Sequence, residues 1–314
     1  MPPMTRRLAL GGLALATLGA GGWFGQGIRR ENAAEALYAR PLQAPDAPLR
    51  VYHLGHSLVG HDMPTMLEQL AGPGHDFHSQ LGWGTSLRDH WEPDVPINGF
   101  AVANDHASHR PATAALAGGG YDAVVLTEMV EIADAIRHHD SADYLARWAK
   151  LVHGAQPDTR VYLYETWHHT DDVNGWLARI DRDLDKYWRR RVLYPALAKA
   201  QVPIHLIPAG QAMAAFVRAV DDAGGVGGVN SLHDLFARHD NGRPDTIHFN
   251  DQGAYLVALT HYAVLYHRSP LGLPHALRRA DGSPARGPSA EAARLMQRVV
   301  WDVVRAYPDT GVAA

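Results

Sequence analysis

Short apolar runs alternate with stretches of helical period along most of the chain. Five segments have the length of buried strands, and all but the second are rich in β-branched and aromatic residues: Arg50–Leu54, Asp76–Leu81, Asp122–Thr127, Arg160–Tyr164 and Pro203–Ile207. Apolar residues at helical spacing lie between several of them, in the segments Met63–Leu70, Ala142–Val152, Trp176–Ala200 and Gln211–Val220. Apolar strands that alternate with helices are typical of a parallel sheet covered on both faces. The pattern therefore predicts a three-layer α/β/α protein with a central, mainly parallel sheet of five strands.

Two long internal segments and the C-terminal end complete the predicted domain. Residues 92–120 and 224–243 have the composition of loops. Because ligands bind at the carboxyl ends of parallel strands, we expect these loops to surround a site there. A final amphipathic helix is expected over Ala290–Ala306. Since there is no internal repeat and no strong shift in composition, residues 50–314 are expected to form one domain.

The N-terminal segment has the composition of an export signal. Arg6-Arg7 precedes an apolar run over residues 8–24, and no acidic residue lies within or before this run. A pair of arginines before an apolar run is typical of a twin-arginine signal. We expect residues 1–36 to be an export signal, or a membrane anchor through the apolar run, followed by a linker over 37–49; an ordinary first helix is the alternative. The segment thus predicts a periplasmic or secreted protein.

Composition excludes several kinds of chemistry. With 46% hydrophobic residues the chain can form a core, and its formal net charge of -4 provides no basic field for a nucleic-acid partner. The sequence has no cysteine, which removes disulfides, thiolate metal ligands and a cysteine nucleophile. Its 20 histidines follow no compact metal-binding spacing such as His-Glu-x-x-His. We therefore expect neither a metal nor another cofactor.

A serine follows the first predicted strand directly, in Gly55-His56-Ser57-Leu58. A serine at a tight strand-to-helix turn projects its hydroxyl and directs its own N–H toward a reacting oxygen. Later in the chain, an Asp-x-x-His sequence, Asp245 to His248, lies just before a predicted helix. This spacing lets one short loop supply a general base, His248, and the carboxylate that orients it, Asp245. The residues predict a Ser-His-Asp triad.

These blocks resemble those of the SGNH (GDSL-like) hydrolase family, over about residues 50–269. Gly55-His56-Ser57-Leu58 is similar to the family's first block, typically Gly-Asp-Ser-Leu, and the stretch from Asp245 to Gly253 is similar to its last block, Asp-x-x-His before a glycine and a helix. Gly84 is similar to the second-block glycine of carbohydrate-esterase-like members. The resemblance implies a flavodoxin-like SGNH hydrolase fold, ester hydrolysis through an acyl-enzyme, and an oxyanion hole made by the N–H groups of Ser57 and Gly84.

The family's third block, usually Gly-x-Asn-Asp, has no counterpart at the end of the third predicted strand. That strand ends in Thr127-Glu128-Met129, so one oxyanion donor stays unassigned. Asn104-Asp105 is an alternative donor, although it precedes the strand. Thr127 or Glu128 is expected to contact the substrate. Glu128 would then have to be neutral, turned away, or paired with Arg88, because a carboxylate would repel the oxyanion.

Aromatic and polar residues near the predicted strand ends are candidates for substrate binding. Trp83 and Trp167 could stack on sugar rings, with packing in the core as the alternative for both. Glu165 and His168 follow the fourth predicted strand and could form hydrogen bonds with hydroxyl groups.

We expect an exported serine esterase that acts on a small-molecule or glycan ester, with O-deacetylation of a glycan as the favoured reaction. The favoured reaction follows from the resemblance to carbohydrate-esterase-like members, the export signal and the tryptophans. A lipase, thioesterase or acyltransferase with the same triad is one alternative, and a metal-dependent hydrolase built on the histidines is another. A glycan-binding protein on an SGNH scaffold is favoured by the missing asparagine and opposed by the triad. The fold by itself does not decide among them.

Overall fold

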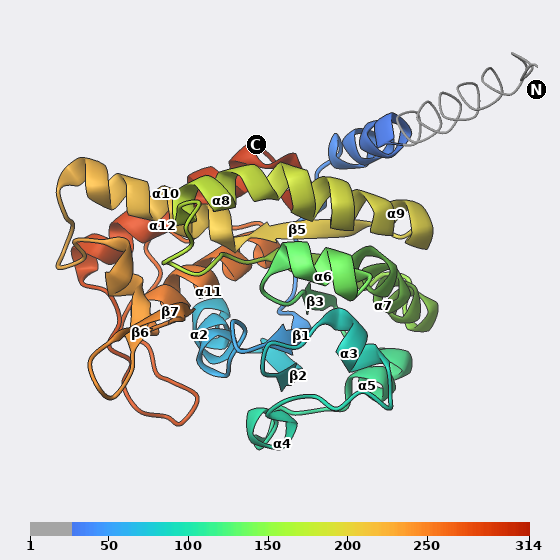
Figure 1. Ribbon diagram of the computed structural model, residues 1–314, viewed down its shortest axis with the longest axis horizontal. Coiled ribbons are helices and arrows are strands. Elements are labelled where there is room, and N and C mark those ends of the chain that lie inside the picture. The colour runs from blue at the N-terminus through green and yellow to red at the C-terminus, as the bar shows by residue number, and fades with distance from the viewer. Residues whose placement is uncertain (1–26) are drawn as a thin grey trace, which may run out of the picture.

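A central parallel sheet organises the protein. The computed structural model describes residues 27–314 (Figure 1). Five strands lie in the order β2-β1-β3-β4-β5, and every neighbouring pair is parallel. Their bounds are β1 Arg50–His56, β2 Asp76–Gly82, β3 Ala123–Thr127, β4 Arg160–Glu165 and β5 Ile204–Pro208. The fold class predicted from the sequence is confirmed, because helices cover both faces of this sheet and the strand order is flavodoxin-like.

Alternate side chains of the strands enter two separate cores. Val51 and Val125 face the first core, whereas their neighbours Tyr52 and Val124 face the second, as expected for the two-residue period of a strand. The first core lies under α2 Asp62–Ala71, α10 Ala209–Ala223, α11 Asp251–Tyr266 and α12 Ala290–Ala306. The second lies under α5 Ala112–Gly118, α6 Ile132–His138, α7 Ser141–Ala155 and α9 Tyr194–Ala200. Both faces are buried, which explains why β1, β3, β4 and β5 are largely apolar on both faces.

The segment predicted as one helix, Trp176–Ala200, changes between α-helix and π-helix twice. It begins as α8 over Trp176–Asp183, continues as a π-helical stretch over Leu184–Leu193 and ends as α9. Pro195, near the start of α9, has no N–H to donate to an α-helical ladder, so the preceding turns cannot continue through it with unbroken α-helical hydrogen bonds.

The two predicted loops contain short elements. Residues 92–120 follow α3 (Leu87–Trp91) and include α4 (Phe100–Ala103) and α5. Within this segment, the N–H of Ser79 donates to the carbonyl of Ser108 at 3.0 Å and the N–H of Arg110 donates to the carbonyl of Ser79 at 3.1 Å, which covers part of the outer edge of β2. Residues 224–243 include a 3₁₀ turn, Leu232–Leu235, and β6 (Phe236–Arg238), which pairs antiparallel with β7 (Pro244–Phe249). A further 3₁₀ turn, Pro308–Thr310, follows α12.

Packing in the structure begins upstream of the predicted domain start at residue 50. Residues 27–38 are helical, and the hydroxyl of Tyr38 donates to the carbonyl of Ile204, on β5, at 2.7 Å. In the segment expected as a linker, the N–H of Leu42 donates to the carbonyl of Gly311 at 2.8 Å. The Arg6-Arg7 pair and the apolar run over 8–24 lie outside the described residues. Within residues 27–314, no helix has both the length and the apolar character needed to span a bilayer.

Buried histidines make the stability of this core depend on pH. His261 of α11 is fully buried, and its Nδ1–H donates to the carbonyl of Val257 at 2.9 Å. Burial lowers the pKa of His261 to about 4, although this hydrogen bond acts in the opposite direction. In an unfolded chain the imidazole has its ordinary pKa of about 6.5.

We therefore expect the free energy of unfolding to fall as the pH is lowered from 6.5 to 4. In this window the unfolded chain binds protons that the folded core does not. Each such histidine lowers the free energy of unfolding by about 1.4 kcal/mol for each pH unit of acidification. Urea unfolding at a series of pH values measures the slope. The variant His261→Leu should show a slope that is shallower by about one proton, and an unchanged slope would contradict the assignment.

Candidate active site

Strand β1 brings Ser57 to the carboxyl edge of the sheet. The strand ends at His56, and Ser57 follows in the turn that leads to α2. At Gly55, an added Cβ atom would lie 2.7 Å from Cβ of Thr127, on β3. Because real side chains do not tolerate such a contact, glycine is what allows β1 to approach β3 just before the serine.

The imidazole of His56 fixes the turn at Ser57. Its Nδ1 accepts from the N–H of Leu58 at 3.3 Å, so the proton of the neutral ring lies on Nε2, which donates to the carbonyl of Glu128 at 2.9 Å. Burial lowers the pKa of His56 to about 4, although the hydrogen bond to Glu128 opposes the shift. The neutral ring therefore joins the carboxyl ends of β1 and β3 without adding a charge beside Ser57.

Asp245 and His248 lie on β7 of the β6–β7 hairpin, which the sequence did not predict as a strand pair. The indole N–H of Trp167 donates to the carbonyl of Ile247, between the two functional residues, at 2.9 Å. Directly after β7, the side chain of Asn250 caps the first turn of α11. The strand is thus held at its middle and at its end, which fixes the backbone that carries the base.

The structure brings Ser57, His248 and Asp245 together in one chain of hydrogen bonds. Nε2 of His248 lies 2.9 Å from Oγ of Ser57, and Nδ1 of His248 lies 2.9 Å from Oδ2 of Asp245. A carboxylate can only accept, so Nδ1 carries the proton and Nε2 is free to accept from the serine hydroxyl. This is the tautomer that a general base for Ser57 requires.

The Asp245 carboxylate is held in its ionised form. Its Oδ1 accepts from the N–H groups of Ile247 and His248 at 2.8 and 2.9 Å. Burial by itself would raise the pKa of Asp245, but these backbone hydrogen bonds and the His248 ring lower it below its ordinary value. The carboxylate therefore remains available to stabilise a protonated His248 over a wide range of pH.

Ser57 and Gly84 supply two backbone N–H groups at the same place. Both residues line one cavity, and within residues 27–314 neither N–H has a hydrogen-bond acceptor. Gly84 has a φ of +59°, a conformation that favours glycine over other residues. These two N–H groups are the donors expected for an oxyanion hole.

Thr127 and Glu128 do not line this cavity, contrary to the expectation that they contact substrate. Both are fully buried, and Oε1 of Glu128 accepts from the N–H groups of Met129 at 2.8 Å and Leu87 at 3.3 Å. Burial raises the pKa of Glu128 to about 7, against the effect of these hydrogen bonds. The carboxyl group is therefore turned away from the cavity.

The expected partner of Glu128, Arg88, is engaged elsewhere. Its guanidinium donates to the carbonyl of His138 at 3.2 Å. The alternative oxyanion donor, Asn104, is likewise excluded, because its side-chain amide is bound to the N–H and carbonyl of Leu81 at 2.9 and 2.8 Å. Asn104 thus closes the end of β2 and does not replace the asparagine of the third block.

Glu165, Trp167 and His168 were expected to bind substrate, but all three are buried. The carboxyl group of Glu165 accepts from the side chain and the backbone N–H of Gln211, and burial raises its pKa to about 8. The ring of Trp167 packs under the β6–β7 hairpin, 5.7 Å from the ring of Phe249. The prediction was wrong for these residues because α10 packs against Glu165, α8 against His168 and the hairpin against Trp167.

His168 belongs to a buried ionic cluster beside the cavity. Its two ring nitrogens lie 3.6 Å from Glu131 and 3.3 Å from Asp183. These three residues could in principle hold a metal ion. However, the guanidinium of Arg179 lies 2.6 Å from Glu131 and 2.7 Å from Asp183. Arg179 therefore supplies the positive charge that the two carboxylates need.

The cavity at Ser57 has a volume of about 920 Å³, which lies within the range of about 300 to 1,000 Å³ that is usual for small-molecule sites. Sequence reasoning singled out four of the residues that line it, Ser57, Trp83, Gly84 and His248. It missed four further residues of the wall, Val130, His169, His239 and Ile247. These residues lie on loops or on β7, and no local sequence pattern marks them.

Comparison with known proteins supports the fold. No protein-family model matches the chain, and no curated protein matches it either. A solved structure of a DUF4886 family protein from Bacteroides uniformis is similar over 83% of this chain and 96% of its own, with a TM-score of 0.52 and 16% identity. A provisionally assigned GDSL-like lipase from Parabacteroides merdae is similar over 70% of this chain and 96% of its own, with a TM-score of 0.40 and 13% identity. Of these two, the first is near enough to support a shared fold.

The close approach at Gly55 leads to a stability prediction. Gly55→Ala should destabilise the protein by about 1–3 kcal/mol, because the added methyl group overlaps Thr127. Gly154→Ala is the matched control, since Gly154 lies in α7 with open space at its Cβ position and should tolerate alanine or gain stability. Thermal unfolding of the three proteins measures the difference. Equal stability of the two variants would contradict the packing described here.

Proposed function

We propose that the protein is a serine esterase that hydrolyses an ester through an acyl-enzyme. The observation that carries the proposal is the Ser57–His248–Asp245 hydrogen-bond chain, which lies at a cavity beside two backbone N–H groups without acceptors among the described residues. A nucleophile, an oriented base and oxyanion donors in one place are the elements of acyl transfer.

In this mechanism Oγ of Ser57 attacks the ester carbonyl while Nε2 of His248 takes the hydroxyl proton. Asp245 stabilises the imidazolium, and the N–H groups of Ser57 and Gly84 bind the oxyanion. His248 then gives its proton to the leaving alcohol as the C–O bond breaks, which leaves the acyl group on Ser57. Water, activated by the same histidine, releases the acid and restores the serine.

We further propose that the acyl group is small and that the alcohol is a glycan, so that the reaction is an O-deacetylation. Support comes from Trp83, whose side chain is 54% exposed at the cavity. A Cβ atom at Gly99 would lie 2.1 Å from the Trp83 ring, so the ring rests directly on this glycine. A ring that is held on one side and open on the other suits stacking on a sugar. Export by the N-terminal segment remains part of this proposal.

A second candidate is a glycan-binding protein with little turnover. It is favoured by the third strand, where Thr127 and Glu128 are buried and offer no side-chain donor to the cavity. One missing oxyanion donor reduces the rate by about 10²–10³-fold. The following test distinguishes a slow esterase from a binding protein that does not hydrolyse esters.

We expect the purified protein to hydrolyse p-nitrophenyl acetate and to be labelled by a fluorophosphonate. Ser57→Ala should abolish labelling, and Ser57→Ala and His248→Ala should each reduce hydrolysis more than about a thousandfold. His239→Ala is a matched control, because His239 lines the cavity but lies outside the hydrogen-bond chain. A wild-type protein that is neither labelled nor active would exclude the esterase and favour glycan binding.

The glycan proposal predicts a selective effect at Trp83. Trp83→Ala should raise the KM for an acetylated oligosaccharide about tenfold, which corresponds to the loss of one aromatic stacking contact. Hydrolysis of p-nitrophenyl acetate should change little, and Trp83→Phe should restore most of the affinity. Steady-state kinetics on both substrates measure this. An equal effect of Trp83→Ala on both substrates would indicate a structural role for the ring.

A further inference from the structure

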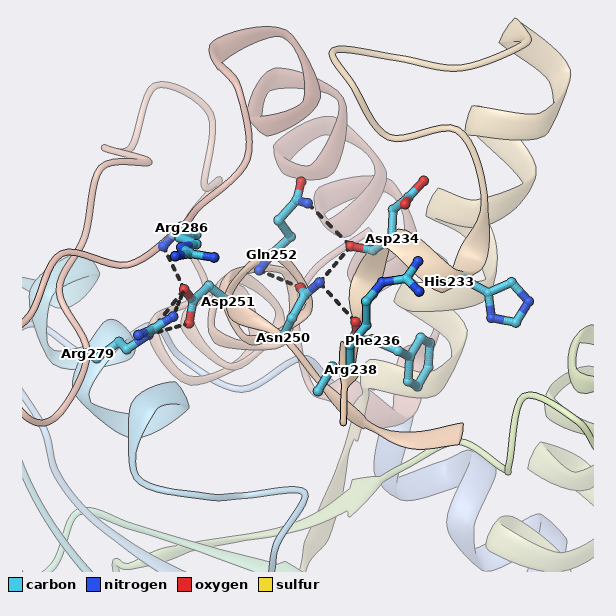
Figure 2. A pocket seen from close by; sticks show the side chains of 10 residues that line it. His233, Asp234, Phe236, Arg238, Asn250, Asp251, Gln252, Arg279 and Arg286 are labelled. Atoms are coloured by element: carbon cyan, nitrogen blue, oxygen red, sulfur yellow. Dashed lines mark hydrogen bonds and ion pairs between the residues drawn. The ribbon is translucent and has the colours of Figure 1, made fainter. Parts of the chain in front are cut away.

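A second cavity lies on the β6–β7 hairpin, apart from the residues that line the cavity at Ser57. It has a volume of about 520 Å³. Its wall consists of residues from the 3₁₀ turn, β6, the start of α11 and the loop before α12, among them Asp234, Arg238, Asn250, Asp251, Arg279 and Arg286. Figure 2 shows Arg279 and Arg286 beside Asp251, Arg238 on the other side, and Asn250 and Gln252 between them.

The two carboxylates of this cavity are already satisfied. Asp251 receives three contacts from Arg279, at 2.6, 2.9 and 3.2 Å, and a fourth from the backbone N–H of Arg286 at 2.6 Å. Asp234 accepts from the N–H groups of Asn230 and Ser231 at 2.9 and 3.1 Å, as a cap of the 3₁₀ turn. Neither carboxylate therefore neutralises a further arginine.

Two guanidinium groups remain without an anionic partner among the described residues. Arg238 donates to the carbonyl of Gly242 at 3.2 Å and forms no ion pair within residues 27–314. The Arg286 side chain has no hydrogen bond or ion pair in that range, and both residues are exposed. Each group presents several N–H donors to the cavity, in whose lining three arginines outnumber the two carboxylates of Asp234 and Asp251.

The cap of α11 does not account for this positive charge. Oδ1 of Asn250 accepts from the N–H groups of Gln252 and Gly253 at 2.9 and 3.2 Å. The side-chain amide of Asn250 donates to the carbonyls of Asp234 and Phe236 at 2.8 and 3.1 Å. Since these N–H groups at the start of α11 are already bound by Asn250, the positive charge of the cavity comes from its arginines.

We infer that this cavity binds an anionic group, a sulfate, phosphate or carboxylate, between Arg238 and Arg286. Guanidinium groups bind such oxyanions through paired, charge-assisted hydrogen bonds. The hairpin connects this site to the other cavity, because Arg238 is followed by His239, which lines the cavity at Ser57. The anion is thus either a substituent of the substrate or a separate ligand, and the chemistry of recognition is the same.

Isothermal titration of sodium sulfate, sodium phosphate and sodium glucuronate into the full protein tests the site. We expect at least one of these anions to bind the wild type, and both Arg238→Gln and Arg286→Gln to weaken its affinity at least tenfold. Arg278→Gln is the matched control, because Arg278 is also exposed and also donates to a glycine carbonyl, that of Gly282, but does not line the cavity. If no anion binds, or if all three variants bind like the wild type, the proposal is overturned.

The titration should give the same result in a Ser57→Ala background, so its failure is distinct from failure of the proposed esterase. A second experiment rests on that proposed function and separates the two sources of the anion. If the anion is part of the substrate, Arg238→Gln should raise the KM for an acetylated glucuronate and leave that for an acetylated glucose unchanged. If it is a separate ligand, both KM values should stay unchanged while anion affinity is lost.

Discussion

The contact between Ser57 and His248 joins residues 191 positions apart in the sequence, and both sides of it are fixed by neighbouring structure. On one side, β1 ends against β3 at Gly55, and the neutral His56 ring ties the turn to Glu128. On the other, β7 is held by the indole of Trp167. A hydrogen bond of this length forms only when both backbones are positioned to within fractions of an ångström, so the site depends on the packing beneath it.

Burial disfavours the charged forms of the polar groups beneath Ser57. Burial favours the neutral imidazole at His56, with a pKa of about 4, and raises the pKa of Glu128 to about 7. Asp245 is the exception, since backbone N–H groups stabilise its charge. A single negative charge behind His248, with few others close to the serine, favours formation of the imidazolium and does not oppose an oxyanion.

The sequence predicted the sheet, its strands and the triad because each follows from a local pattern: apolar runs for strands, and short blocks at strand ends for Ser57, Asp245 and His248. It failed where tertiary packing decides exposure. Glu165 ends β4 and His168 follows it, so both would be exposed at a bare strand end, but Gln211 of α10 packs against the first and Asp183 of α8 against the second. The hairpin was not predicted because β6 spans three residues, Phe236–Arg238, too few for a periodic signal.

Both outer strands of the sheet are covered along part of their length. The segment around Ser108 pairs with β2 at Ser79, and the hydroxyl of Tyr38 donates a hydrogen bond to the carbonyl of Ile204 on β5. Exposed strand edges are templates on which other chains can add a strand and aggregate. Covering of these stretches disfavours extension of the sheet there by a strand of a second molecule.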